Sequence, residues 1–164
     1  HVHSGLMQVD WAGRWQKLAL KEDKTLILDS THNPEGARFL EEALECLTIE
    51  TQKKPVIITG ILGEERAAAL MPVIGRWASE LYLVEPAQPR ALTPAGLRSF
   101  LSGSQAELTT HQRSLAQLFP SCDCCRAGQS GDTVVVVGSI YLIGEVLQRL
   151  QDQDSSQDTL QDHP

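Results

Sequence analysis

Two short, wholly apolar segments restrict the fold of this 164-residue chain more than any other feature. Residues 134–137 are four valines in a row, and residues 56–58 form a similar run between Pro55 and Gly60. A strand without a polar face is buried on both sides, which is typical of a parallel sheet covered by helices. Parallel strands are joined by helical crossovers, so the sequence predicts helices between these runs.

A helical pattern is found in the expected place, after residues 25–29. Asn33 is a good N-cap residue and Pro34 suits the first helical position, so a helix is expected to start here and run to about Leu47. Its apolar residues are spaced three and four apart, as one buried face requires: Ala37, Leu40, Ala43, Leu44 and Leu47.

The same alternation continues along the chain. The expected strands are 17–20, 25–29, 55–60, 80–84, 105–109 and 132–138, with the first two forming a hairpin and the last one central. The expected helices are 34–47, 64–78 (interrupted or kinked near Pro72 and Gly75), 94–101, 112–119 and 140–150. We therefore expect an α/β fold with a Rossmann-like, mostly parallel sheet and helices on both faces, spanning residues 1–150. Residues 151–164 are too polar to order themselves and are expected to form a disordered tail.

Composition excludes several classes of protein. The formal charge of −7 and the lack of a basic run argue against a nucleic-acid partner. The apolar runs are far shorter than the roughly 20 residues that span a bilayer, and no leader peptide is recognisable, so we expect a cytoplasmic protein. The start at His1 rather than Met suggests a piece of a longer one. Cys122, Cys124 and Cys125 lack zinc-ligand spacing, and a reduced loop is favoured over a soft-metal site.

In a parallel sheet, ligands bind where the carboxyl ends of the strands meet the following helices. This restricts the search to residues 29–34, 59–66, 84–94 and 137–141. In the first turn, Asp29 could accept hydrogen bonds from the two hydroxyls of a ribose, and His32 lies at a helix start, which favours phosphate. An ordinary helix cap with a surface histidine explains this turn equally well.

Three other residues could bind a ligand. Arg14, close to two tryptophans, could stack on a base or bind phosphate, although packing is the more usual role. Arg90 could pair with a carboxylate, and Ser139 is either a helix N-cap or a contact to a substrate carboxylate. The sequence has no Gly-x-x-x-x-Gly-Lys-[Ser/Thr] phosphate loop, so the isolated chain is expected to lack complete catalytic activity.

Four segments, taken in order, resemble one family. Residues 29–37 resemble the Asp-Gly-Ala-His-Asn-Pro-x-Gly-Ala signature of the folylpolyglutamate and dihydrofolate synthases, which belong to the Mur ligase superfamily. Trp-Ala-Gly-Arg at 11–14, Pro-Arg-Ala at 89–91 and the Gly-Ser-Ile-Tyr-Leu segment within 137–146 are similar to further family elements. The resemblance covers residues 9 to 150 and identifies the C-terminal domain.

The resemblance implies an ATP-dependent, ADP-forming ligase that adds L-glutamate to a folate or dihydropteroate carboxylate through an acyl-phosphate. An N-terminal ATPase domain of the same polypeptide would carry the phosphate loop and the ligands of Mg²⁺, and the whole would be a monomer. Arg14, Asp29, His32 and Asn33 would contact the nucleotide, with His32 also catalytic, and Ser139 would meet the incoming glutamate.

Two turns depart from the family pattern. Ser30-Thr31 replaces the usual Gly-Ala, and residues 63–66 replace a frequent Asp-Lys-Asp. Two alternatives stay open: a Mur-type ligase of peptidoglycan precursors, and a nucleotide-binding or interaction module without catalysis. The sequence does not distinguish addition of the first glutamate from extension of a glutamate chain.

Overall fold

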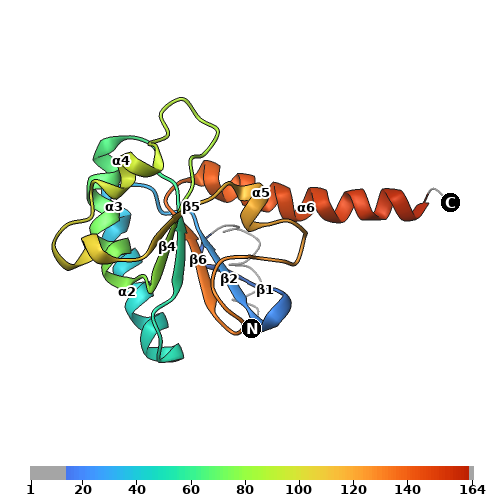
Figure 1. Ribbon diagram of the computed structural model, residues 1–164, viewed down its shortest axis with the longest axis horizontal. Coiled ribbons are helices and arrows are strands. Elements are labelled where there is room, and N and C mark those ends of the chain that lie inside the picture. Colours follow the sequence, from blue (N-terminus) through green and yellow to red (C-terminus); the bar gives the residue numbers. More distant parts are fainter. Residues whose placement is uncertain (1–13, 163–164) are drawn as a thin grey trace.

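The structure is a computed structural model that describes residues 14–162, with side chains described for residues 14–151 (Figure 1). Its secondary-structure elements, in chain order, are β1 (Gln16–Ala19), η1 (Lys21–Asp23), β2 (Thr25–Asp29), α2 (Pro34–Thr51), β3 (Val56–Thr59), α3 (Glu64–Trp77), β4 (Glu80–Leu83), α4 (Pro94–Arg98), η2 (Gly103–Glu107), β5 (Thr110–Gln112), α5 (Leu115–Leu118), β6 (Thr133–Val137) and α6 (Ile140–Asp162).

One six-stranded sheet, in the order β1-β2-β6-β3-β4-β5, organises the molecule. All strands are parallel except β1, which forms an antiparallel hairpin with β2. The mostly parallel sheet, the initial hairpin and the central position of residues 132–138 are therefore confirmed. The register is level at the carboxyl edge, because Val137 of β6 pairs with both Asp29 and Thr59.

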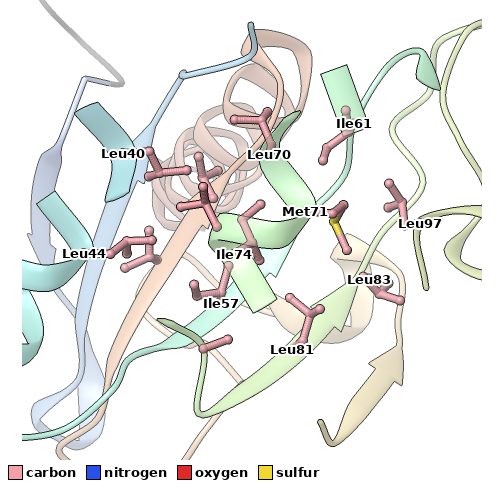
Figure 2. Packing of buried hydrophobic residues seen from close by; sticks show 14 of the residues in the cluster. Leu40, Leu44, Ile57, Ile61, Leu70, Met71, Ile74, Leu81, Leu83 and Leu97 are labelled. Atoms are coloured by element: carbon pink, nitrogen blue, oxygen red, sulfur yellow. The ribbon is translucent and has the colours of Figure 1, made fainter. Parts of the chain in front are cut away.

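Helices cover both faces of the sheet, as Figure 1 shows. Odd and even strand positions point to opposite sides, so Val135 and Val137 belong to one buried cluster, and Val134 and Val136 to the other. The first cluster packs against α2, α3 and α4, and Figure 2 shows Leu40 and Leu44 of α2 with Leu70, Met71 and Ile74 of α3 against the strand residues Ile57 and Leu81. The second packs against α5 and α6. The four adjacent strands β2, β6, β3 and β4 are thus buried on both faces of the sheet.

Between residues 105 and 119 the expected strand is wrong and the expected helix is too long. Residues 103–107 form the 3-10 helix η2 rather than a strand, and the fifth strand is Thr110–Gln112, which pairs with β4. The expected helix 112–119 is reduced to α5, because Ser114 and Gln117 form a reciprocal capping box that fixes its start. Side-chain capping, rather than apolar periodicity, determines the structure of this segment.

Helix boundaries differ in three other places. α4 ends at Arg98 instead of 101, whereas α2 extends past Leu47 to Thr51. α3 passes through Pro72 without interruption. A proline inside a helix costs about 3 kcal/mol. Burial of the neighbouring Leu70, Met71 and Ile74 outweighs that cost, at about 1.5 to 3 kcal/mol per side chain.

α6 is helical as far as Asp162, well beyond the expected end at residue 150. Extending an existing helix requires no new nucleation, so a polar segment can follow the apolar first turns in the same conformation. The domain boundary at residue 150 stays a prediction. No helix within residues 14–162 is both long and apolar enough to cross a membrane.

Candidate functional site

Small residues bring the carboxyl ends of β6, β3 and β4 close together. Gly138 has φ +128°, and a Cβ atom there would lie 2.6 Å from Thr59 Oγ1 and 2.8 Å from the carbonyl oxygen of Gly60. A Cβ at Gly60 would lie 2.6 Å from the carbonyl oxygen of Val84. The buried Thr59 hydroxyl donates to the carbonyl oxygen of Val137 at 2.6 Å. These contacts hold the ends of the strands in place relative to one another, and with them the turns that follow.

A cavity of about 380 Å³ lies where these turns meet. Its lining comes from the segments that follow β2, β3, β4 and β6, which are the four turns indicated by the sequence: His32, Leu62, Arg66, Gln88, Pro89, Arg90, Ser139, Ile140 and Tyr141. The structure therefore brings His32, Arg90 and Ser139 together, although they are far apart in the sequence.

The cavity is basic. His32, Arg66 and Arg90 line it, and no aspartate or glutamate is among its described lining residues. Within the part of the chain that the structure describes, neither arginine forms an ion pair with a carboxylate. In a chain of net charge −7, two such guanidinium groups at one cavity favour an anionic ligand.

Ser139 closes one side of the cavity as the cap of α6. Its Oγ accepts a hydrogen bond from the backbone N–H of Tyr141 at 3.0 Å, so the N-cap role is confirmed. The hydroxyl proton can still be donated, since the oxygen acts only as acceptor in that contact. Ile140 and Tyr141, which follow, are 49% and 47% exposed and give the cavity an apolar rim.

His32 has a defined orientation in the first turn. Its Nδ1 lies 2.9 Å from the carbonyl oxygen of Ser30. Because a carbonyl oxygen can only accept, Nδ1 carries the proton, and in the neutral ring Nε2 is an acceptor. Asn33 caps α2, its Oδ1 accepting from the N–H of Gly36 at 2.8 Å. The cap explains why Asn33 occupies this position, and a nucleotide contact by Asn33 stays a prediction.

Asp29 ends β2 and is only 6% exposed. Burial raises the pKa of its carboxyl group, and the hydrogen bonds from Thr31 and the positive charge of Arg14 offset this only in part. A carboxylate kept buried at a strand end against this cost is typical of a functional position.

The predicted site residues form two adjoining groups. Asp29 and Arg14 interact electrostatically but do not line the cavity, whereas His32 and Ser139 do. His32 comes from the same turn as Asp29 and connects the groups. Residues 11–13, which complete the element resembling Trp-Ala-Gly-Arg, lie outside the described residues.

Two functional candidates were missed from the sequence. Arg66 lies in the segment that departs from the family pattern, yet it lines the cavity from the first turn of α3. The position of Arg66 at a strand-to-helix turn, three residues after Gly63, could have indicated it as a site residue from the sequence. Thr31, noted from the sequence only for the bulk and hydroxyl that it adds to the turn, hydrogen-bonds to Asp29.

The described residues contain no group of three or more His, Cys, Asp or Glu side chains placed to hold an ion. The cysteines of residues 122–125 and Cys46 are free thiols, with only Cys125 buried. This is consistent with the favoured reduced loop.

The level parallel sheet, with its cavity at the carboxyl edge, defines a Rossmann-like α/β domain. The model of the family described as Mur ligase, glutamate ligase domain, matches residues 13–140, and the chain belongs to this family. Among curated proteins, it is 29% identical to folylpolyglutamate synthase of Lacticaseibacillus casei, over 92% of this chain and 32% of that protein. It is 26% identical to dihydrofolate synthase/folylpolyglutamate synthase of Haemophilus influenzae, over 88% of this chain and 36% of that protein.

Solved structures share the fold. The bifunctional folylpolyglutamate synthase/dihydrofolate synthase of Yersinia pestis, complexed with AMPPNP and Mn, superposes with a TM-score of 0.68 at 24% identity, over 92% of this chain and 34% of that chain. FolC of E. coli in complex with ADP superposes with a TM-score of 0.66 at 22% identity, over 87% of this chain and 32% of that chain. The chain thus spans about a third of the length of the curated relatives it matches.

Proposed function

We propose that this chain is the nucleotide- and glutamate-contacting domain of a larger ATP-dependent, ADP-forming ligase. The enzyme would join L-glutamate to the carboxylate of a folate or dihydropteroate through an acyl-phosphate. An N-terminal ATPase domain of the same polypeptide would supply the phosphate loop and the ligands of Mg²⁺. The observation that carries the proposal is the basic cavity, to which four strand-to-helix turns contribute His32, Arg66, Arg90 and Ser139.

His32 is proposed to act on the phosphate side of the reaction. Its Nδ1 is held by the carbonyl oxygen of Ser30, so the opposite ring nitrogen is positioned by the turn rather than by the ligand. When the ring is protonated, Nε2 donates to a phosphate oxygen and stabilises the negative charge that develops there. A donor fixed in advance loses little entropy on binding.

The two arginines and Ser139 suit the second substrate. L-glutamate brings two carboxylates, and a guanidinium group binds a carboxylate through two parallel hydrogen bonds. Arg66 and Arg90 would each bind one of the two carboxylates, and the Ser139 hydroxyl would donate a hydrogen bond to one of these carboxylates as well. Asp29 and Arg14, beside the cavity, would take the ribose and the phosphates of ATP.

The test is an assay of the complete polypeptide that carries this chain, with ATP, labelled glutamate and either dihydropteroate or tetrahydrofolate. We expect ADP release that depends on both the folate substrate and glutamate. His32→Ala should lower kcat about 100-fold, the usual effect of removing one preorganised donor. His111→Ala is the matched control, because that half-buried histidine pairs with Glu80 away from the cavity.

Each outcome has a definite meaning. ADP release with a peptidoglycan precursor in place of the folate would assign the chain to the Mur-type ligases. No ligase activity with either substrate would leave a binding module. Unchanged turnover in His32→Ala would remove His32 from the site while leaving the ligase assignment intact. The isolated chain should release no ADP in any of these assays.

A further inference from the structure

Thr31 makes three contacts with the carboxylate of Asp29. Its backbone N–H lies 3.3 Å from Oδ1, and its hydroxyl lies 3.2 Å from Oδ1 and 3.2 Å from Oδ2. One hydroxyl proton is thus shared between both carboxylate oxygens. Hydrogen bonds from a hydroxyl to a carboxylate are typically about 2.5 to 2.7 Å long, so neither oxygen is saturated.

The carboxylate therefore keeps acceptor capacity. Its two oxygens offer about four lone-pair sites, and Thr31 supplies only two protons. When the hydroxyl proton is donated to Oδ2 alone and the backbone N–H to Oδ1, one acceptor site on each oxygen is left by Thr31 for donors from a ligand. The vicinal hydroxyls of a sugar such as ribose are two such donors.

Thr31 itself is held in place by α2. A Cβ atom at Gly36 would lie 2.7 Å from the Thr31 methyl carbon, so the missing side chain of Gly36 makes room for this methyl group. Gly36 is in turn fixed by its backbone bond to Asn33 Oδ1. A β-branched side chain has few χ1 rotamers, and with the methyl group in this space the hydroxyl of Thr31 faces Asp29 before any ligand binds.

We propose that Thr31 is a positioning residue, whose hydroxyl orients the Asp29 carboxylate to accept two adjacent hydroxyl groups of a ligand. The inference rests on the proposed function, in which the ligand is the ribose of ATP. It gives a role to a residue at which the chain departs from its family's usual alanine.

The charged and titratable groups around Asp29 define the background for a pH test. Arg14, which precedes β1, lowers the Asp29 pKa, and His32 lies three residues further along the same turn. Burial raises this pKa, and the Thr31 hydrogen bonds oppose the rise. Removal of the hydroxyl should raise the pKa further, while Arg14 and His32 remain unchanged.

The experiment compares binding of ATP and 2′,3′-dideoxy-ATP to the complete polypeptide in wild-type form and in Thr31→Val, Thr31→Ser and Thr48→Val forms. Thr31→Val preserves the shape but removes the hydroxyl, and should weaken ATP binding about 5- to 10-fold, the equivalent of one hydrogen bond. Binding of the dideoxy nucleotide should not change. Thr31→Ser should recover most of the loss, and Thr48→Val, which removes a threonine hydroxyl that donates to the carbonyl oxygen of Leu44 within α2, should match the wild type.

A pH profile separates positioning from a structural role. The acidic limit of ATP binding should move to higher pH in Thr31→Val, because the unprotonated carboxylate is then less stabilised. Equal loss of both nucleotides, or an unmoved acidic limit, would contradict the inference. If Thr31→Val does not fold, Thr31→Ala replaces it, since alanine also lacks the hydroxyl. Failure of the wild type to bind ATP would instead reject the proposed function.

Discussion

In the turn between β2 and α2, neighbouring residues have different structural roles. Asn33 starts α2, Ser30 orients His32, and Thr31 contacts the buried Asp29. Most of these contacts stabilise the fold, but the buried carboxylate does not. Its raised pKa means that the folded chain holds this group in its charged form less readily than the unfolded chain does.

We therefore predict that Asp29→Asn stabilises the isolated chain at neutral pH. An acid whose pKa is raised by folding opposes folding once the pH exceeds its pKa in the unfolded chain, and asparagine removes this cost. Urea unfolding of both forms from pH 4 to pH 8 should show an advantage of the variant that shrinks as the pH falls. An advantage that is constant with pH would contradict the interpretation. ATP binding by the complete polypeptide should be lost.

Sequence reasoning identified some of these residues and missed others for a physical reason. The meeting of His32 with Ser139 follows from topology alone, because the carboxyl ends of parallel strands share one edge. The contact of Thr31 with Asp29 depends on a rotamer set by Gly36. Arg66 lines the cavity from the first turn of α3, in a segment that lacks the expected motif. Such details are decided by tertiary packing.

At the scale of elements, the turn between β6 and α6 connects the fold to the site. Gly138 adopts a backbone conformation that other residues rarely tolerate, and its hydrogen atoms face Thr59 and Gly60. Any side chain here would push β6 away from β3, and with it the cap of α6 at Ser139.

Gly138→Ala should accordingly destabilise the chain by about 2 kcal/mol or more, since it combines a strained φ with a clash against backbone. It should also weaken ATP and glutamate binding by the complete polypeptide. Gly144→Ala is the matched control, because its added Cβ meets no atom within 4 Å. In the interior of α6 this change should stabilise the chain by about 0.5 to 1 kcal/mol. Equal thermal unfolding of the two variants would contradict this account.

The elements themselves were predictable to different degrees. Strands with no polar face, such as β3 and β6, indicate a buried parallel sheet. The start of α2 was predictable because it depends on the cap residue Asn33 and on Pro34, which are adjacent in the sequence. β5 is short and half exposed, so its composition carries little signal. The start of α5 depends on a capping box that competes with apolar periodicity.

At the scale of the whole molecule, the amino ends and the carboxyl ends of the strands differ in how their charged side chains are paired. At the amino edge, Asp132 accepts from Lys53 and from the N–H of Gln129, and the buried Lys24 donates to the carbonyl oxygen of Cys125 at 2.6 Å. Burial alone would raise the pKa of Asp132, but Lys53, Gln129 and Lys24 together lower it. Charges are paired at this edge, whereas Arg66 and Arg90 at the cavity form no ion pair with any carboxylate among the described residues.

Lys53→Met should therefore lower stability by about 1 to 2 kcal/mol without changing ATP binding by the complete polypeptide. An acid with a lowered pKa stabilises the fold above its unfolded pKa, and this contribution is lost as the pH falls through the folded pKa. Without Lys53 that loss should begin at a higher pH, which acid titration of the unfolding free energy would measure. Lys54→Met, which removes a neighbouring lysine whose ammonium group donates to the carbonyl oxygen of Arg76, should change little. Similar acid profiles for both variants would contradict this prediction.

The level carboxyl edge also bears on how such a domain diverges. The strands fix where every turn begins, so an exposed side chain in one turn can change without shifting the other turns, whereas Gly138 cannot. Both departures from the family pattern, at residues 30–31 and 63–66, fall in turns and leave the strand register intact. We therefore expect exchanges of exposed side chains in these turns to change ligand binding more than the free energy of unfolding.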